Sequence, residues 1–256
     1  MAHVADVDAG VLDAASLGGR RRFAARVGPW FARLVEVPAA VLVVAEIVVL
    51  FAGILARYVF HKPIVWSDEL AGILFLWLAM LGSVIAFQRG EHMRMTAIVG
   101  MLQPRARAFL DVVAVAAPLA FLLLVLHPAY EFAADEVFVT TPALEIPNAW
   151  RAAALPVGIV LMLLTALLRL ASVADWRHVV GALALVAAVA GAMVLLSPAL
   201  KPLGNLNLLI FFVGLVGLMV FAAVPIAFAF GLATFGYIAL TTSTPDVVVI
   251  GAWTRA

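Results

Sequence analysis

The chain has 256 residues, of which 66% are apolar and only 12% are charged, and its mean hydropathy is +1.16. A soluble domain is about 45–50% apolar and needs a charged surface to stay in solution. The composition therefore excludes a cytosolic enzyme, a nucleic-acid-binding module and a disordered tail. It is typical of an integral membrane protein.

The residue types that carry most enzyme chemistry are absent or scattered. There is no cysteine, which excludes disulfides, iron–sulfur clusters, thiolate zinc sites and thiol catalysis. The five histidines lie too far apart in the sequence to suggest a metal site. Because the sequence also contains no phosphate-binding loop and no nucleophile beside a base, we expect neither an enzyme nor a resident cofactor.

Long apolar runs predict the membrane spans, since a helix needs about 20 mostly apolar residues to cross the bilayer. Six runs follow one another: Val37–Phe60, Trp66–Gln88, Ala108–Tyr130, Ala149–Leu170, Val179–Ser197 and Leu206–Leu240. The last run would measure about 52 Å as a straight helix, so it is either one long kinked helix or two spans that turn near Pro225. The sequence predicts an all-α, polytopic transmembrane protein with six or seven spans.

Arginine placement indicates which ends of the spans face the cytoplasm. Eleven arginines fall on one side of the membrane when the spans alternate: Arg20, Arg21, Arg22, Arg26, Arg33, Arg89, Arg94, Arg105, Arg107, Arg169 and Arg177. Four cations fall on the other side: Arg57, Lys62, Arg151 and Lys201. The connection from Glu131 to Asn148 is acidic and has no lysine or arginine. These counts predict a cytoplasmic N-terminus.

Two short stretches have the spacing of helices that lie on the membrane surface. In the first, apolar side chains recur every three or four residues between arginines, at Phe23, Val27, Trp30, Phe31 and Leu34. In the second they recur ahead of Pro104, at Met95, Ile98, Val99 and Leu102. We therefore expect short interfacial amphipathic helices.

One charged residue lies inside a predicted span. Glu46 is near the middle of the first span, where an ionised carboxylate costs about 2.5–3.5 kcal/mol unless it is paired or protonated. It is either a group that handles ions or protons, or a protonated glutamate that hydrogen-bonds to a neighbouring helix.

A polar cluster, Trp66-Ser67-Asp68-Glu69, opens the second span. Ser67 can cap the helix, the two acids suit the positive end of the helix dipole, and Trp66 suits the headgroup level. Arg57 and Lys62 lie on the same side and are candidates for pairing with the acids. All of these features fit a structural role at the start of a helix.

Three further features allow more than one interpretation. His61 and His127 lie at the outer ends of the first and third spans, where paired histidines can hold a haem and lone histidines are interface residues. The segment Thr141–Pro147 has two prolines, which predict a stiff, extended segment that suits either a contact surface or a plain loop. Gly82 lies inside a span, where a small residue lets helices approach closely.

Four segments together resemble the small permease (Q) subunit of TRAP transporters, which are tripartite secondary transporters that depend on a periplasmic binding protein. They are Arg57-Tyr58-Val59-Phe60, Trp66-Ser67-Asp68-Glu69-Leu70, Leu76-Trp77-Leu78-Ala79-Met80-Leu81-Gly82-Ser83 and Gly90-Glu91-His92-Met93-Arg94-Met95. Thr141–Pro147 resembles a second characteristic segment of the family. The resemblance extends over roughly residues 30–175.

The C-terminal part has a different resemblance. Leu208–Thr241, which includes Val224-Pro225-Ile226-Ala227-Phe228-Ala229-Phe230-Gly231, is similar to the opening of the large permease (M) subunit of the same transporters. The resemblance implies a fused protein that contains only the beginning of the large subunit. Its expected parts are an interfacial segment at residues 1–36, a four-helix small-permease domain at 37–175, a linker helix and outer loop at 176–205, and the large-permease portion at 206–256.

The resemblance also implies a function. It predicts the uptake of an organic acid with sodium across the bacterial inner membrane, with the substrate delivered by a soluble periplasmic binding protein. In this family the substrate and sodium sites belong to the large subunit, so we expect neither here. The small subunit is expected to be a scaffold that contacts the rest of the large permease, the binding protein and membrane lipids, and no nucleic acid. The residues expected at packing and subunit interfaces are Arg57, Trp66, Asp68, Glu69, Gly82, His92, Pro142 and Pro147.

Two alternatives from other functional classes stay open on the sequence alone. A respiratory membrane anchor that binds haem or quinone would use His61 and His127. A stand-alone channel or transporter would need a polar site in the middle of the membrane, for which Glu46 is the candidate.

Overall fold

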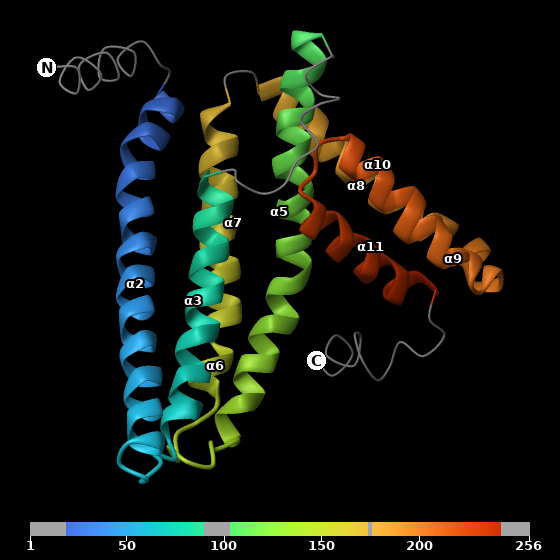
Figure 1. The fold of residues 1–256 in the computed structure, drawn as a ribbon. Helices are drawn as coiled ribbons and strands as arrows, with labels where there is room; N and C mark the ends of the chain where they lie inside the picture. The colour runs from blue at the N-terminus through green and yellow to red at the C-terminus, as the bar shows by residue number, and fades with distance from the viewer. Residues whose placement is uncertain (1–18, 90–102, 174–175, 242–256) are drawn as a thin grey trace, which may run out of the picture. The chain divides into compact units, whose positions relative to one another are not determined.

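The computed structural model describes residues 19–89, 103–173 and 176–241 (Figure 1). Its elements in chain order are α2 (Gly19–Tyr58), α3 (Ser67–Arg89), α5 (Pro104–Asp135), η1 (Glu136–Phe138), α6 (Ala149–Ala152), α7 (Ala154–Ser172), α8 (Trp176–Leu200), η2 (Lys201–Leu203), α9 (Leu206–Leu208), η3 (Leu209–Leu215), α10 (Val216–Phe221) and α11 (Ile226–Thr241). Over these residues the only extended pairing is one isolated bridge between Thr140 and Pro147. The predicted all-α fold is confirmed.

Five helical stretches in the described residues are long and apolar enough to cross a membrane. They are Arg26–Tyr58, Ser67–Arg89, Ala106–Phe138, Ala149–Ser172 and Trp176–Leu203. Each coincides with one of the first five runs predicted from the sequence. At most of its ends, a helical stretch extends one to eleven residues beyond the predicted run. Hydropathy located these spans because each is a continuous apolar run of spanning length.

The N-terminal segment differs from the prediction in one respect. Its residues are helical, but α2 is a single helix of 40 residues that continues from Gly19 into the first span, through Pro29 and Pro38. No break separates an interfacial helix from the span. Phe31 and Val35 are both buried on one face of α2, and this packing carries the helix across two prolines that each remove one backbone hydrogen bond. The second interfacial helix, predicted at Met95–Leu102, lies outside the described residues.

The last apolar run forms two shorter helical stretches, Leu206–Phe221 and Ile226–Thr241. The first ends in a Schellman turn: the Val224 amide donates to the Met219 carbonyl, and the Ala223 amide donates to the Val220 carbonyl, both at 3.0 Å. Ala223 has a φ of +62°, and Pro225 follows, which starts the next helix without needing an amide donor. Of the two sequence alternatives, the structure has the turn near Pro225.

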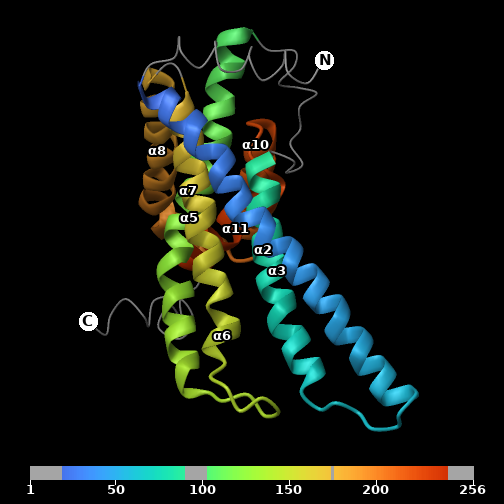
Figure 2. The ribbon, with the colours of Figure 1, turned by 90° about the vertical axis from the view of Figure 1, so that its left-hand side faces the viewer.

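The chain divides into two compact units. Unit 2 contains residues 26–91 and 125–165, and unit 1 contains the rest. In unit 2, α2 and α3 are neighbouring helices joined by a short connection (Figures 1 and 2). An ion pair of 2.9 Å between Arg89 and Glu36 joins them at the end opposite that connection. Buried apolar residues of α3, among them Ile73, Leu81, Val84 and Phe87, form part of its core.

Unit 1 is built around the two short helical stretches near the C-terminal end of the described residues. Phe211 is fully buried, and its ring makes an edge contact with Tyr237 of α11. Phe228 makes a similar edge contact with Phe121 of α5. The Schellman turn is buried as well, because Ala223 packs against Ala114 and Leu110 of α5. Aromatic contacts therefore hold α11 both to η3 and to α5.

Candidate functional site

The candidate site is the end of unit 2 at which α2 connects to α3 and α5 connects to α6. It is called the loop end below, and it consists of residues 57–69 and 136–150. Most of the sequence-predicted site residues lie here. Three of them, Arg57, Asp68 and Glu69, are positioned by contacts between the start of α3 and segments that precede or follow it by up to 74 positions.

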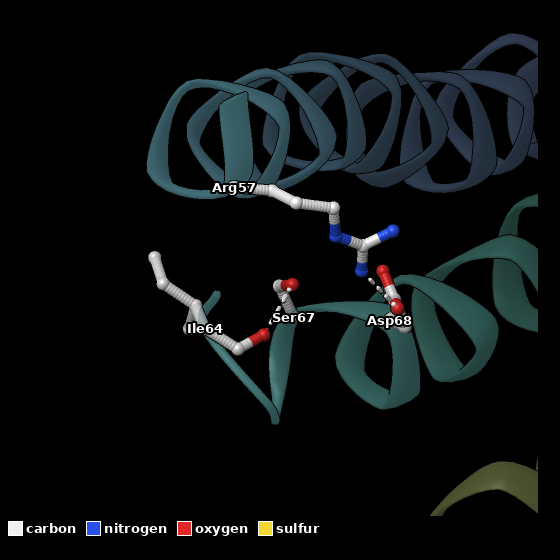
Figure 3. Close-up of polar contacts among 4 residues, drawn as sticks. All are labelled: Arg57, Ile64, Ser67 and Asp68. Carbon is white, nitrogen blue, oxygen red and sulfur yellow. Dashed lines mark hydrogen bonds and ion pairs between the residues drawn. The ribbon is translucent and has the colours of Figure 1, made fainter. Parts of the chain in front are cut away.

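Arg57 and Asp68 form an ion pair at the loop end. A guanidinium nitrogen of Arg57 donates to an Asp68 carboxylate oxygen at 2.9 Å (Figure 3). The pairing expected from the sequence is thus present between these two residues. Both side chains are at least half exposed, and an exposed pair of this kind contributes about 0–1 kcal/mol. The pair links the last turn of α2 to the first turn of α3.

Ser67 is buried and does not act as the predicted cap. Its hydroxyl donates to the Ile64 carbonyl at 2.8 Å, and its amide donates to the same carbonyl at 3.2 Å (Figure 3). Both bonds close the turn that precedes α3. Gly53 of α2 lies directly opposite, where an added Cβ would come within 2.9 Å of the Ser67 hydroxyl oxygen. Gly53 therefore allows α2 and α3 to approach closely at this level.

Glu69 fastens the loop between α5 and α6. Its Oε2 accepts a hydrogen bond of 2.7 Å from the amide of Ala143. Its other carboxylate oxygen is buried and has no hydrogen-bond partner among the described residues. The sequence suggested a cation as the partner of this acid, but the contact is with a backbone amide, and Lys62 forms no ion pair within the described part of the chain.

The segment Thr141–Pro147 forms a turn that is closed by its own hydrogen bonds. The extended segment predicted from its two prolines is therefore wrong. The Thr141 amide donates to the Ile146 carbonyl at 2.9 Å, and the Glu145 amide donates to the Thr141 carbonyl at 3.1 Å. The Ile146 amide donates to the Thr141 hydroxyl at 3.3 Å. The prolines restrict the backbone at their own positions and at the residues before them, so the residues between, 143 to 145, can still turn the chain. Glu145 takes a φ of +52° to complete the turn.

One buried polar residue that the sequence analysis missed, Asn148, holds the base of the loop. The Asn148 side-chain amide donates to the Glu136 carboxylate, and the Asn148 backbone amide donates to the Val139 carbonyl at 2.7 Å. Thr141 and Asn148 are both buried. The sequence held a signal for Asn148, since asparagine is common directly before a helix. It held no signal that Glu136, 12 positions earlier, would be its partner.

A tryptophan inside the second span completes these contacts. The indole nitrogen of Trp77 donates to the backbone carbonyl of Trp150 in α6 at 2.8 Å. This carbonyl belongs to a four-residue helix that is separated from α7 by one residue. Trp77 therefore pins the short helix α6 to α3, and the sequence pattern alone had shown it only as an apolar residue of a span.

The side chains of the other predicted residues that the structure describes take no part in this network. Trp66 is 44% exposed, and Pro142 and Pro147 are exposed in the loop. Gly82 is exposed on α3, with nothing within 4 Å of the position that a Cβ would take. Glu46 is half-buried, on the same face of α2 as Ala39 and Gly53, and has no polar partner within the described ranges. His92 lies outside the described residues.

The two histidines considered for a haem occupy different settings. His61 is exposed in the connection between α2 and α3, with a φ of +53°. The Nδ1 of His127 lies 3.4 Å from a carboxylate oxygen of Glu131, one turn further along α5. Neither residue is among those that the hydrogen bonds of the loop end bring together.

A bundle of long apolar helices with a fastened loop at one end defines a multi-pass membrane protein, and comparison with known families specifies its class. Residues 46–176 match the family described as tripartite ATP-independent periplasmic transporters, DctQ component. The chain belongs to this family. It is therefore a membrane subunit of a TRAP transporter and a multi-pass protein of the bacterial inner membrane.

Individual relatives agree with this assignment. The chain is 31% identical over 127 residues to the sialic acid TRAP transporter small permease protein SiaQ of Vibrio cholerae, covering 50% of this chain and 73% of that protein. It is 32% identical over 122 residues to the sialic acid TRAP transporter permease protein SiaT of Haemophilus influenzae, covering 48% of this chain and 20% of that protein. The C4-dicarboxylate TRAP transporter small permease protein DctQ of Vibrio cholerae is 28% identical over 107 residues, 42% of this chain and 46% of that protein.

The chain thus spans only one fifth of the length of SiaT. The family is a transporter component and not a respiratory anchor, so of the functional classes considered from the sequence the transporter subunit is the one that the comparisons support.

Proposed function

We propose that residues 37–175 act as the scaffold of a sodium-driven importer of an organic acid. In this proposal the scaffold steadies a large permease subunit that carries the substrate and sodium sites. The observation that carries it is the family match over residues 46–176, which covers most of unit 2 and its fastened loop. An inside-negative potential contributes about 2.3 kcal/mol per net charge per 100 mV, so entry of sodium in excess can accumulate an organic anion.

The exposed face of α3 supports a contact with a partner helix. Its exposed positions recur every three or four residues and are mostly small: Gly72, Phe75, Ala79, Gly82 and Ser83. At both glycines an added Cβ would meet no atom of this chain within 4 Å. In membranes, small residues are enriched where helices pack against each other, because they let the backbones approach. We assign this face to the large permease.

The loop end supports a second contact. Glu69, Thr141 and Asn148 hold the loop from inside, while Pro142, Glu145 and Pro147 are exposed. A loop fixed in this way presents the same surface at all times, which lowers the entropy lost on binding. We assign this surface to the transporter's partners outside the membrane, the large permease and the soluble binding protein. Arg57 and Asp68, which pair with each other and are at least half exposed, belong to the same proposed surface.

The proposal extends to residues 206–256 as the beginning of a large permease, with residues 1–36 as an interfacial segment and 176–205 as a linker. The resemblance of Leu208–Thr241 to the opening of that subunit motivates it. The similarity to SiaT, a permease protein much longer than the matched segment, is in keeping with a fusion. The organic acid is proposed from the names of the relatives, which act on sialic acid and C4-dicarboxylates.

Transport in liposomes tests the function. The chain, a large permease and the matching binding protein are reconstituted, and uptake of radiolabelled sialic acid or succinate is followed with and without an inward sodium gradient. We expect uptake only when all components and the gradient are present. Uptake that is unchanged when this chain is omitted contradicts the scaffold role.

Co-purification tests the interface. We expect Gly82→Leu, Trp66→Ala and Glu69→Ala to reduce the amount of large permease that co-purifies with the chain. Gly191→Leu is the matched control, since Gly191 in α8 also has open space around it and lies outside the family match. Equal recovery with Gly82→Leu and with Gly191→Leu contradicts the assignment of the α3 face.

A further inference from the structure

The N-terminal half of α2 carries a stripe of two arginines and a tryptophan. Arg26, Trp30 and Arg33 follow one another at the spacing of one helix face, and all three are exposed, Trp30 by 69%. The two arginines are about 10 Å apart along the axis at 1.5 Å per residue. Neither forms an ion pair within the described residues. The nearest acid on the helix, Glu36, is paired with Arg89 of α3.

The same face continues without a break into the first span. Val37, Val41, Val44, Val48 and Phe51 extend the stripe, and each is about 60% exposed. The opposite face of α2 is the one that packs within unit 2, through the buried residues Phe31, Val35 and Ala39. The cations and the tryptophan therefore stand on a face of α2 that unit 2 leaves uncovered.

The side chains on this face favour lipid over a protein partner. They are large and apolar along the span, with no small residue among the five, whereas the exposed face of α3 is mostly small. Where the apolar part ends, an indole and two guanidinium groups follow, and these groups suit the headgroup level of a bilayer. Arginine binds phosphate oxygens through paired hydrogen bonds, and basic groups next to a span attract anionic lipids.

We propose that Arg26, Trp30 and Arg33 form a binding site for the headgroup of an anionic phospholipid, whose acyl chains lie along Val37–Phe51. The two guanidinium groups hold the phosphate and the Trp30 ring lies at the boundary with the glycerol region. The site depends on α2 being one continuous helix, since that continuity keeps the cations in line with the apolar stripe. It is independent of the transported substrate and of the large permease.

Lipid retention by the full chain tests the site. The protein is placed in bicelles of equal parts phosphatidylglycerol and phosphatidylethanolamine, and the lipids that it retains are counted by native mass spectrometry. We expect the wild type to prefer phosphatidylglycerol, and the double variant Arg26→Gln/Arg33→Gln to lose about fivefold of that preference per arginine. Arg26→Lys/Arg33→Lys keeps the charge and should keep most of the preference.

Two controls make the result specific. Lys62→Gln/Lys201→Gln removes the same charge from other exposed positions and should leave the preference unchanged; equal loss in both double variants overturns the proposal, as does equal retention of the two lipids by the wild type. If the glutamine variant does not fold, the wild-type preference is measured at rising salt, where a preference that salt leaves unchanged overturns it.

A third measurement distinguishes lipid from a covering polypeptide. The chain has no cysteine, so Val44→Cys gives a single site for a fluorescent label on the same face. In the assembled transporter, quenching of this label by a lipid-soluble quencher supports the proposal. A label that is shielded from the quencher shows that another subunit covers the face, and that result overturns the lipid site.

Discussion

The carboxylate of Glu69, in the first turn of α3, accepts a hydrogen bond from the backbone amide of Ala143, 74 positions further along the chain. This contact joins the start of one membrane-spanning helix to the loop that precedes another. The loop is also closed by hydrogen bonds within itself, between Thr141, Glu145 and Ile146. Glu69 therefore determines where the exposed surface of Pro142 and Glu145 is held.

We expect Glu69→Ala to free the loop without unfolding the helices. The Ala143 amide would lose its charged acceptor, so its hydrogen exchange should become about tenfold faster or more, while amides in the middle of α3 keep their rates. Hydrogen exchange with mass spectrometry of the purified chain measures both. Glu145→Gln changes an acid of the same loop whose side chain has no described partner, and it should leave exchange at Ala143 unaltered. Equal acceleration in both variants would show that Glu69 does not fasten the loop.

Gly53 should tolerate no side chain, because its added Cβ would lie 2.9 Å from the Ser67 hydroxyl oxygen and 3.3 Å from its Cβ. Ser67 is buried and short, and its hydroxyl is bonded to the Ile64 carbonyl, so it cannot move aside without losing that bond. We expect Gly53→Ala to destabilise the chain by about 1–3 kcal/mol, measured by thermal unfolding in detergent.

Gly72→Ala provides the control for this substitution. Gly72 is also a helical glycine, but no atom lies within 4 Å of its added Cβ. Alanine is the better helix former by about 1 kcal/mol, so this variant should be as stable as the wild type or slightly more stable. If both substitutions have the same effect, α2 and α3 do not approach each other at Gly53 as described.

The helices and the loop differ in how far the sequence predicted them. The first five spans followed from hydropathy alone, because the membrane requires about 20 apolar residues in a row whatever the helix contacts. The Arg57–Asp68 pair was also foreseeable, since the two charges lie 11 positions apart around one short connection. Both the spans and this ion pair could be predicted because each depends on residues that are close together in the sequence.

The loop end could not be predicted in the same way. Glu69 and Ala143, or Trp77 and Trp150, are more than 70 positions apart, and a backbone amide or carbonyl partner has no residue type that a sequence pattern can reveal. The closed shape of Thr141–Pro147 depends on the Thr141 hydroxyl and carbonyl, whereas the prolines pointed to an extended segment. Ser67 was a plausible cap, but its hydroxyl instead donates to the preceding turn.

Trp77→Phe should weaken the attachment of α6 to α3. The substitution keeps an aromatic ring in the span and removes the indole N–H that donates to the Trp150 carbonyl at 2.8 Å. A single neutral hydrogen bond contributes about 0.5–1.5 kcal/mol, and we expect a loss of that size in thermal unfolding. Trp66→Phe is the matched control, because Trp66 is 44% exposed and its indole has no described partner. A loss that is no larger than in the control would count against the bond.

Glu145→Gly should stabilise the loop. Glu145 has a φ of +52°, a left-handed conformation that costs a residue with a Cβ about 1–2 kcal/mol and costs glycine little. Glycine also makes the unfolded chain more flexible, which lowers the free energy of unfolding and offsets part of this stabilisation. We expect a net gain of about 0.5–1 kcal/mol in thermal unfolding. Glu145→Ala removes the same carboxylate but keeps the Cβ, so it should show no gain; a gain of equal size in both variants would point to the lost charge instead.

The orientation predicted from the arginines has its own test, since the absence of cysteine allows single-cysteine variants. Ser16→Cys lies just ahead of the arginine-rich stretch, and Glu145→Cys lies in the acidic connection without lysine or arginine. Basic segments stay on the cytoplasmic side because their translocation is opposed during insertion. We therefore expect a membrane-impermeant maleimide to label Glu145→Cys in cells whose outer membrane alone is permeabilised, and to label Ser16→Cys only after the inner membrane is opened. The reverse labelling pattern would show that the protein has the opposite orientation in the membrane, with the Arg26–Arg33 stripe in the outer leaflet.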